Sequence, residues 1–424
     1  MIGFIDKIVN KNIANNTSNI NISKIKSNKK VKKIFYSLFK YSEKSDARYV
    51  GGCIRKILNH EEIDDIDIAT NLKPNEVIDV FKRNNINYFE SGIAHGTITA
   101  NIEEKNFEIT SLRKDISTDG RHAKVEFSDD WYEDAKRRDF TFNSIYADLD
   151  GNLYDPFDGK SDLKNGIVKF IGKPEERIKE DYLRILRYIR FFINYSKSKH
   201  SDSVKKIIKQ NISGITKISS DRLLLELKKI INSDFFLKIY SDKFCLEILQ
   251  LVFPQLKNIS VFNKLSDYAQ TNFKFQDFIF LIALMIIDNT DNCEYFLYKY
   301  NISKENKKRI IFLNNIFSNK IENNFFTEKN LWKIFYLEGK NRVIDVINFA
   351  IFKSKKNENK LIKMKNFFQN QSMPVFPISA KLLMEKYNLE EGKDLGQKLK
   401  KIKDFWIENG FKLTNKDVEK IMNT

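Results

Sequence analysis

The sequence lacks most features of a secreted or membrane-spanning protein. It has only three cysteines, Cys53, Cys245 and Cys293. Because they lie far apart with no paired spacing, they argue against a disulfide framework and against a zinc site. The longest apolar run, Phe278 to Ile287, is too short to cross a bilayer and predicts a buried helix. The first 45 residues contain no Arg and no apolar segment before a cleavage site, so we expect no secretory signal.

These absences favour a cytoplasmic protein with no membrane partner, with import into an organelle as the weaker alternative. The charge balance is strongly basic, because 73 Lys and Arg residues against 56 Asp and Glu residues give +17 at pH 7. Such an excess favours a polyanionic partner, nucleic acid above all. The abundance of Lys, Asn and Ile is also what an A/T-rich genome produces, so the charge alone leaves both explanations open.

Glycine is scarce outside one early segment. Nine of the 15 glycines fall between Gly51 and Gly172. Turns are therefore concentrated in this segment. A helix is expected from Pro74 through Phe81, because Pro is favoured in the first turn of a helix. Short β-like runs alternate with such helical patterns at Ala47–Val50, Ile66–Ala69, Thr97–Asn101, Phe107–Thr110 and Ser144–Asp148. This segment predicts an α/β or α+β domain with a small sheet over about residues 46–165.

From Pro174 onward the pattern is helical. Apolar residues recur at three- and four-residue intervals, as one helix burying one face requires. The first such series is Ile178, Tyr182, Ile185, Ile189 and Phe192. Similar spacing continues to the end of the chain, with no fixed-period repeat, so we expect an all-helical remainder and no solenoid.

A Gly-Gly turn is the first feature with chemical meaning. Gly51 and Gly52 follow the predicted strand Ala47–Val50. Glycines at that position let the backbone approach a phosphate closely, and Arg55 could reach the same phosphate with its planar guanidinium. A lone Gly-Gly pair is weak, since many turns contain one by chance.

Two carboxylates, Asp65 and Asp67, follow within the next predicted strand. Residues i and i+2 of a strand project from the same face, and two ionised carboxylates side by side repel unless a cation lies between them. Oxygen ligands of this kind suit Mg²⁺, and two such ions form the clamp used in phosphoryl transfer. A solvated acidic turn is the alternative, which the position after the Gly-Gly turn disfavours.

A third carboxylate, Glu108, lies between Phe107 and Ile109. Alternation in a strand turns these two apolar neighbours to the core and Glu108 to the opposite face. There it could complete the metal site from a neighbouring strand. The alternative is an ordinary exposed glutamate.

Three motifs in order carry a resemblance to a known family. They are Gly51–Arg55 with Asp65–Asp67, then Arg137–Asn143, then Glu180–Phe191. Together they resemble the class II tRNA nucleotidyltransferase and bacterial poly(A) polymerase family, most strongly over residues 46–235. The resemblance implies a catalytic head at 46–165, a helical neck at 166–235, and a helical body and tail at 236–424 that binds tRNA. Residues 1–45 are expected to be an N-terminal helical extension.

The resemblance also implies roles for the head residues. Asp65 and Asp67 would hold the catalytic metals, and Gly51, Gly52 and Arg55 the triphosphate. From the second motif, Arg138 would contact the incoming nucleotide and Asp139 its ribose hydroxyl, with Asn143 beside them. A 2′-hydroxyl contact explains a choice of ribonucleotides, because a buried carboxylate left unpaired penalises the analogue that lacks the hydroxyl. A surface charge cluster is the alternative for this motif.

In the third motif, Asp181 and Arg184 are expected on one face of a helix. An i, i+3 salt bridge between them is the simplest interpretation. In the family they select the base, because cytosine and adenine both present an amine donor beside a ring-nitrogen acceptor, which an accepting Asp and a donating Arg complement. Arg187 and Arg190 follow as further nucleotide-site residues, with an exposed basic stripe as their alternative.

Two features depart from the family pattern or lie outside it. Lys56 stands where the family usually has Asp, so weaker orientation of Arg55 is expected, with activity retained because both metal carboxylates remain. The four histidines, His60, His95, His122 and His200, form no ligand or phosphohydrolase pattern. His95 is predicted to be a hydrogen-bonded core residue.

The particular activity is predicted from two segments. Tyr88–Thr97 is similar to the CCA-adding form rather than to the poly(A) polymerases, and Arg113–Arg121 resembles the flexible loop of enzymes that add the terminal A. The resemblance therefore implies addition of C, C and A to tRNA from CTP and ATP with Mg²⁺. Poly(A) or partial addition is the alternative, and an inactive RNA-binding protein is the alternative from another class. The oligomeric state is left open.

Overall fold

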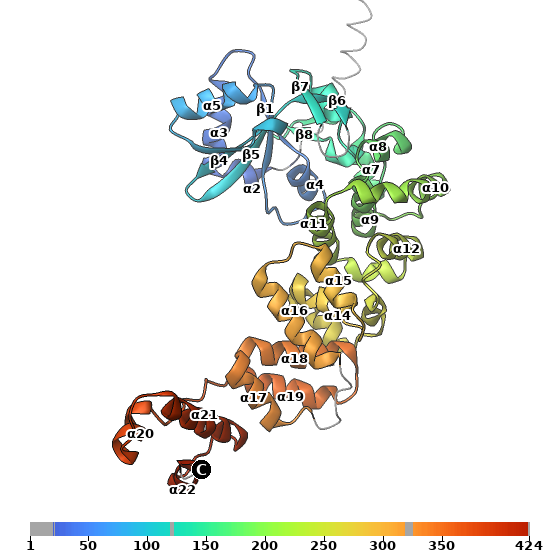
Figure 1. Cartoon of the computed structure of the whole chain (residues 1–424). Helices are drawn as coiled ribbons and strands as arrows, with labels where there is room; N and C mark the ends of the chain where they lie inside the picture. Colours follow the sequence, from blue (N-terminus) through green and yellow to red (C-terminus); the bar gives the residue numbers. More distant parts are fainter. Residues whose placement is uncertain (1–19, 21, 119–122, 319–324, 423–424) are drawn as a thin grey trace, which may run out of the picture. The chain divides into compact units, whose positions relative to one another are not determined.

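The computed structural model describes residues 20, 22–118, 123–318 and 325–422 (Figure 1). The chain forms two compact units, Met1–Val252 and Phe253–Thr424. Within the described residues of the first unit, α2 (Ser23–Lys26) and α3 (Lys29–Phe39) precede the sheet. Residues 1–19 and 21 of the predicted N-terminal extension lie outside the described residues. The four-part division of the chain proposed above stays a prediction.

A seven-stranded mixed sheet is the centre of the first unit. Its strand order is β3-β4-β5-β2-β1-β8-β9. The strands are β1 (Ala47–Val50), β2 (Asp67–Thr70), β3 (Asn87–Gly92), β4 (Thr97–Ile102), β5 (Lys105–Ser111), β8 (Tyr146–Ala147) and β9 (Leu153–Tyr154). Strands β2 and β5 pair in parallel. The other neighbours in the order pair antiparallel.

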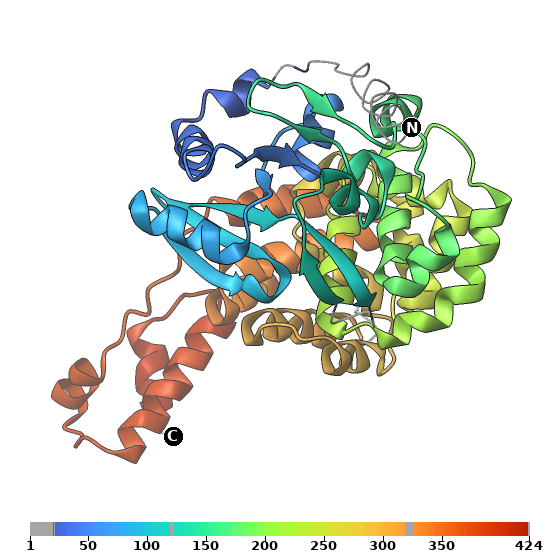
Figure 2. The same cartoon turned by 90° about the horizontal axis from the view of Figure 1, so that it is seen from above.

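Two helices cover this sheet because each has one apolar face. Helix α3 buries Val31, Ile34 and Leu38, and α5 (Pro74–Arg83) buries Val77 and Phe81. Figure 1 shows both helices lying against the sheet. A separate hairpin of β6 (Arg113–Thr118) and β7 (Ala123–Phe127) lies beside it, which Figure 2 shows from above. Residues 119–122, part of the predicted flexible loop, lie outside the described residues.

The remaining helices of the first unit lie between and after its strands. They are α4 (Gly52–Leu58), α6 (Trp131–Lys136), α7 (Gly159–Asn165), α8 (Pro174–Glu180), α9 (Leu183–Tyr195), α10 (Asp202–Asn211), α11 (Ser220–Ile231) and α12 (Lys243–Val252). Short 3-10 helices are η1 (Ile93–His95), η2 (Thr141–Asn143), η3 (Ile212–Lys217) and η4 (Phe236–Tyr240).

The apolar series from Ile178 to Phe192 is predicted to lie on one helix, and that prediction is wrong. The helix is broken between α8 and α9, because Asp181 has an extended backbone with φ −152° and ψ 104°. The side chain of Asp181 accepts a hydrogen bond from the Leu183 N–H at 3.1 Å. Aspartate at a helix start competes in this way for backbone donors. Asp181 therefore precedes the helix that carries Arg184 instead of sharing a face with it.

The second unit is all-helical in its described residues, as predicted. Its helices are α13 (Asp267–Asn272), α14 (Phe278–Ile286), α15 (Asn292–Lys299), α16 (Lys304–Phe317), α17 (Glu328–Glu338), α18 (Lys340–Lys353), α19 (Glu358–Gln369), α20 (Ala380–Tyr387), α21 (Lys393–Glu408) and α22 (Asn415–Met422), with 3-10 helices η5 (Ile259–Lys264) and η6 (Phe273–Phe275). The apolar run at α14 is a buried helix, which confirms that prediction. None of the helices in the described part of the chain combines the length and apolar character needed to cross a membrane.

Candidate nucleotide site

The Gly-Gly turn joins β1 to α4 at one edge of the site. Gly51 has φ +68°, which L side chains rarely adopt, so glycine is required there. A Cβ on Gly52 would lie 3.9 Å from an Asp67 carboxylate oxygen and 3.9 Å from Arg55 Nη2. The turn therefore brings the backbone against both the carboxylates and an arginine of the predicted site.

The predicted carboxylates come from two neighbouring strands. Asp67 is the first residue of β2 and pairs in register with Glu108 of the parallel strand β5. Phe107 and Ile109 are buried while Glu108 is exposed, which confirms the predicted alternation. Asp65, however, lies two residues before β2 in a segment without regular structure, so its prediction as a strand residue is wrong.

The environment of Asp67 disfavours its ionised form. Burial, together with the negative charges of Glu108 and Asp65, raises the pKa of this carboxyl to about 6, against the attraction of Arg138 and Arg55. Carboxyl groups held close enough to repel one another need a proton or a cation to relieve the repulsion. The arrangement suits a hard divalent cation with oxygen ligands.

A buried aspartate that the sequence analysis missed orients the second motif. Asp134 of α6 is 1% exposed. It pairs with Arg137 at 2.8 Å and Arg138 at 3.1 Å, and accepts a hydrogen bond from the Tyr146 hydroxyl at 2.6 Å. Burial opposes its charge, but the two guanidinium groups outweigh burial and hold the pKa of Asp134 well below its usual range. Its spacing of three and four residues before the arginines was the available signal.

Asp139 connects the second motif to helix α9. It accepts a hydrogen bond from Asn143 Nδ2 at 2.8 Å and pairs with Arg187 at 2.5 Å. Asn143 in turn accepts a hydrogen bond from Arg55. The three polar side chains Arg55, Asp139 and Asn143 are buried. One hydrogen-bonded network therefore joins the Gly-Gly turn, the second motif and the third.

Asp181 and Arg184 have different partners. Asp181 pairs with Arg222 of α11 at 2.7 Å. Arg184 pairs with Glu180 at 2.6 Å and donates to the Arg177 carbonyl at 2.7 Å. The simple Asp181–Arg184 salt bridge is therefore not what holds these two side chains.

The last predicted residue of the third motif is also paired. Arg190 of α9 contacts Glu226 of α11 at 2.6 Å, and Glu226 is 3% exposed. Helix α11 thus supplies partners to both ends of the motif. Sequence reasoning missed Arg222 and Glu226 because only the packing of α9 against α11 brings them there.

A cavity of about 720 Å³ brings these residues together. It is lined by every predicted site residue except Glu108, namely Gly51, Gly52, Arg55, Asp65, Asp67, Arg138, Asp139, Asn143, Asp181, Arg184, Arg187 and Arg190. Nine basic and five acidic side chains line it, a formal excess of 9 − 5 = 4 positive charges. That excess suits a polyanionic ligand such as a triphosphate.

The geometry bears on two further residues named in the sequence analysis. Lys56 lines the cavity and forms an ion pair with Asp64, so the lysine that replaces the family's acid has an acidic partner beside it. Its predicted effect on the orientation of Arg55 stays a prediction. His95 is exposed at the end of η1, so its prediction as a core residue is wrong. The glycine that follows it ends the 3-10 helix and leaves the ring at the surface.

Comparison with known proteins identifies the class and then the family. Residues 47–169 match the family model described as the poly A polymerase head domain. With the carboxylate and arginine cavity, this match defines a nucleotidyltransferase. The chain is 33% identical to the mitochondrial CCA tRNA nucleotidyltransferase 1 of Mus musculus, over 88% of this chain and 85% of that protein. It is 30% identical to the CCA-adding enzyme of Lactococcus lactis, over 87% of this chain and 90% of that protein. The chain belongs to the family of CCA-adding tRNA nucleotidyltransferases.

Solved structures agree with this fold. The CCA-adding enzyme of Bacillus stearothermophilus, in complex with CTP, has a TM-score of 0.71 at 22% identity and covers 92% of this chain and 95% of its own. The Thermotoga maritima enzyme, complexed with tRNA, has a TM-score of 0.62 at 19% identity, covering 96% and 98%. The predicted head with a small sheet followed by helices is thereby confirmed. The mouse relative is named mitochondrial, so cytoplasmic location stays a prediction beside an organellar one.

Proposed function

We propose that the chain adds C, C and A in turn to the 3′ end of tRNA, using CTP and ATP and releasing pyrophosphate. The observation that carries the proposal is the cavity in which carboxylates from β2 and its neighbourhood face an excess of arginines. In this reaction the tRNA 3′-hydroxyl attacks the α-phosphate of the nucleotide. The names of the relatives, CCA tRNA nucleotidyltransferase and CCA-adding enzyme, support this substrate class.

Asp65 and Asp67 would hold Mg²⁺, with Glu108 beside them. Their oxygen donors fit a hard cation, and the raised pKa of Asp67, caused by burial and then by neighbouring carboxylates, supports a site that a cation stabilises. When bound, a pair of metal ions would lower the pKa of the attacking hydroxyl and stabilise charge on the departing pyrophosphate. The protein's own contribution is to keep both carboxylates at one wall of the cavity.

The arginines would bind and orient the nucleotide. Arg55 and Arg138 are held by Asn143 and Asp134 respectively, so their guanidinium groups are already oriented before a triphosphate arrives. Preorganised donors stabilise developing charge without reorganisation at the moment of reaction. Asp139 would accept the ribose 2′-hydroxyl.

Base selection would use Asp181 and Arg184. Cytosine and adenine each offer a donor and an acceptor that an aspartate and an arginine complement. Each of the two side chains already has a protein partner, Arg222 and Glu180 respectively. Binding of the base would therefore exchange these contacts for contacts with the nucleotide, which makes Arg222 and Glu180 part of the selection.

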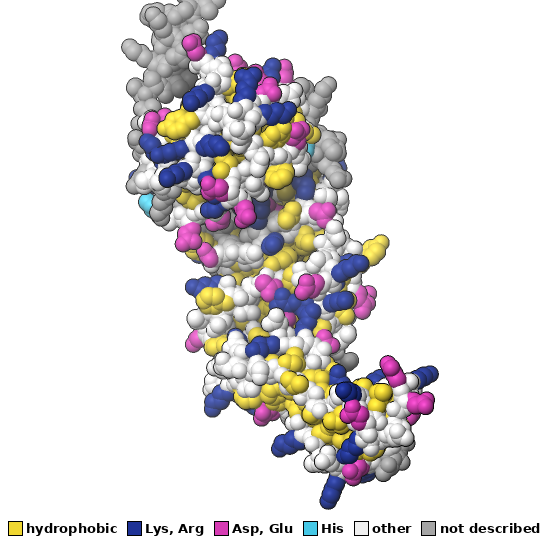
Figure 3. Space-filling view, turned by 90° about the vertical axis from the view of Figure 1, so that its left-hand side faces the viewer, with side chains coloured by type: hydrophobic (Ala, Val, Ile, Leu, Met, Phe, Trp, Pro, Cys, Tyr) yellow, Lys and Arg dark blue, Asp and Glu magenta, His cyan; other side chains and the backbone are white. Residues whose placement is uncertain are grey.

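The helical segments would bind the tRNA backbone through charge. On the face drawn in Figure 3, Lys and Arg side chains are interspersed with acidic and apolar ones. A dispersed distribution favours contacts with phosphates over reading of bases. Raising the salt concentration should weaken tRNA binding steeply, and a flat response would contradict this part of the proposal.

The deciding experiment supplies tRNA transcripts that end before CCA, after C and after CC, with CTP and ATP given separately. Ordered incorporation is expected, with C added to the first two transcripts and A only to the third. Addition of A without limit would assign the chain to poly(A) synthesis instead. Addition that stops after CC would make it a partial enzyme, and binding without any addition would leave an RNA-binding protein.

A further inference from the structure

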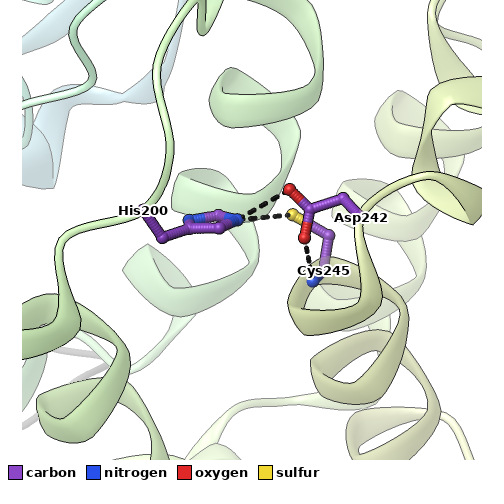
Figure 4. Close-up of side chains that lie close together, drawn as sticks. All are labelled: His200, Asp242 and Cys245. Carbon is purple, nitrogen blue, oxygen red and sulfur yellow. Dashed lines mark hydrogen bonds and ion pairs between the residues drawn. The ribbon is translucent and has the colours of Figure 1, made fainter.

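A second group of side chains with metal-binding chemistry lies outside the nucleotide cavity. His200 comes from the segment between α9 and α10, and Asp242 and Cys245 come from the start of α12 (Figure 4). The ligand atoms of the three residues lie within 4.8 Å of one another. The sequence analysis found no ligand pattern for His200, because 42 residues separate it from Asp242.

We propose that His200, Asp242 and Cys245 form a zinc site. One imidazole nitrogen, one carboxylate oxygen and one thiolate sulfur are ligands that Zn²⁺ accepts, with water in the fourth position. An aspartate and a thiolate would neutralise the charge of the ion. None of the steps in nucleotide addition proposed above uses these residues.

The distances are close to those of a tetrahedral zinc. Usual bond lengths of about 2.0–2.1 Å to nitrogen and about 2.3 Å to sulfur place two such ligands about 3.6 Å apart. His200 Nε2 and Cys245 Sγ are 3.6 Å apart. His200 Nε2 and Asp242 Oδ2 are 2.8 Å apart, a hydrogen-bond distance, so the carboxylate would move outward by about half an ångström to reach the ligand separation.

The surroundings of the imidazole are those of a metal ligand. Its other nitrogen, Nδ1, lies 2.9 Å from the Tyr188 hydroxyl, which fixes the ring's orientation as outer partners of zinc-bound histidines do. The ring stacks on Phe192 with centroids 3.4 Å apart, and Phe244 contacts it edge-on at 4.8 Å. The other Asp242 oxygen, Oδ1, accepts from the Cys245 backbone N–H at 2.9 Å, so the carboxylate is held as well.

The protons of Cys245 and His200 can be displaced by a metal ion, and the side chain of Asp242 is exposed enough to admit one. Nε2 faces both a carboxylate and a sulfur, and one N–H cannot serve both. On binding, the thiol proton would leave to solvent and the single proton of neutral imidazole would move from Nε2, where it serves Asp242, to Nδ1, where it is directed at Tyr188. Cys245 is fully buried, whereas the Asp242 side chain is 22% exposed, which provides an entry route and a position for water.

The site would link the loop after α9 to α12. Tyr188 belongs to α9, the helix that also carries the arginines of the nucleotide cavity. Zinc would therefore brace this helix against the rest of the first unit. The expected result of binding is a higher melting temperature, because a ligand that binds only the folded state stabilises it by mass action.

The test uses the full, untagged chain, stripped with a chelator and titrated with Zn²⁺ and separately with Co²⁺. We expect one equivalent of tightly bound metal by elemental analysis, and a thiolate-to-cobalt charge-transfer absorption. Cys245→Ser should lose that absorption, and Cys293→Ser, which alters a buried cysteine of the second unit, should keep it. Metal bound weakly or not at all, or an absorption that survives Cys245→Ser, would overturn the proposal.

One variant separates a metal site from a hydrogen-bonded group. Asp242→Asn keeps the Oδ1 acceptor for the Cys245 N–H and can still hydrogen-bond to His200, but a neutral amide is a poor zinc ligand. We expect zinc affinity to fall at least about tenfold while the metal-free melting temperature stays close to that of the parent chain. Unchanged zinc affinity in this variant would show that the carboxylate does not bind the ion.

Discussion

The two units bury charge in different ways. Among the described residues, the buried Asp, Glu, Lys and Arg side chains of the first unit are Arg55, Asp134, Asp139, Arg177 and Glu226. Arg55 and Asp139 line the nucleotide cavity, Asp134 and Glu226 pair with arginines that line it, and Arg177 donates to the carbonyl of Arg138 at 2.6 Å. In the described part of the second unit, the buried side chains of these four types are Asp345 and Lys365. Asp345 pairs with Arg309, which joins α18 to α16.

The buried charges of the first unit are not explained by stability alone. A buried ion pair rarely stabilises a fold more than apolar residues of similar volume would. The second unit accordingly builds its core from periodic apolar helices. The first unit keeps a connected network of charged side chains where arginines must be held in place for an anionic substrate. In the second unit, the Asp345–Arg309 ion pair only joins two helices.

Removing a metal carboxylate should have the largest effect. Asp67→Ala is expected to lower the rate of C addition at least about a thousandfold, because metal-ion stabilisation is worth several kcal/mol in the transition state. Single-turnover kinetics with a tRNA transcript ending before CCA would measure it. The fold should persist, since burial and its acidic neighbours already disfavour the charge of Asp67, and circular dichroism is the control. Turnover close to the parent rate would remove Asp67 from catalysis.

Breaking one buried ion pair in each unit sharpens the comparison directly. Asp134→Ala leaves Arg137 and Arg138 without their buried carboxylate, whereas Asp345→Ala removes the buried partner of Arg309 and leaves its ion pair with Asp277 at 2.8 Å. Asp134→Ala should destabilise its unit by about 3 kcal/mol and Asp345→Ala by less, both read from denaturant unfolding. Only Asp134→Ala should also raise the KM for CTP at a temperature where both variants remain folded.

The Asp345→Ala variant serves as the matched control for this experiment. Equal changes in KM for the two variants would mean that the network around Asp134 has no positioning role. A change in KM for Asp345→Ala alone would reverse the distinction between the units.

The sequence predicted the elements whose signal is local. The strand Ala47–Val50 and the buried helix at α14 were found from short apolar runs, and the carboxylate Glu108 from strand alternation. Strands β3, β6, β7 and β9 were not predicted. Strands β3 and β6 are largely polar, β9 has only two residues, and β7 is stabilised by its pairing with β6. The motifs named the cavity residues through family resemblance, and most of those residues do line one cavity.

What the sequence could not supply was the partner of each charge. Asp181 was expected beside Arg184, yet it pairs with Arg222, which lies 41 residues further along the chain. The break before α9 could not be predicted from periodicity, because the apolar spacing continues across it although the backbone of Asp181 is extended. Long-range pairing and capping are decided by tertiary packing, which a helical pattern does not encode.

The pH dependence of stability should reveal the strain at Asp67. Its pKa is raised above the unfolded value by burial and then by Glu108, so the folded state binds this proton more tightly than the unfolded state does. The penalty is therefore absent below about pH 4, develops as pH rises to about 6, and is constant above that. In a chelating buffer, Asp67→Asn should melt higher than the parent chain at pH 8, with the difference shrinking toward pH 4. Mg²⁺ should raise the melting temperature of the parent chain and not that of the variant.

The smallest effect is expected at Lys56, where the chain departs from its family. Lys56 pairs with Asp64, whose side chain is 70% exposed, and solvent-exposed ion pairs contribute less than about 1 kcal/mol. Lys56→Ala should therefore change the kcat/KM for CTP by less than about fivefold and leave the melting temperature almost unchanged. A loss comparable with that of Asp134→Ala would instead mean that Lys56 contacts the triphosphate as a substitute for the missing acid. Lys56 at the exposed edge of the cavity would then contribute as much to CTP binding as the buried Asp134.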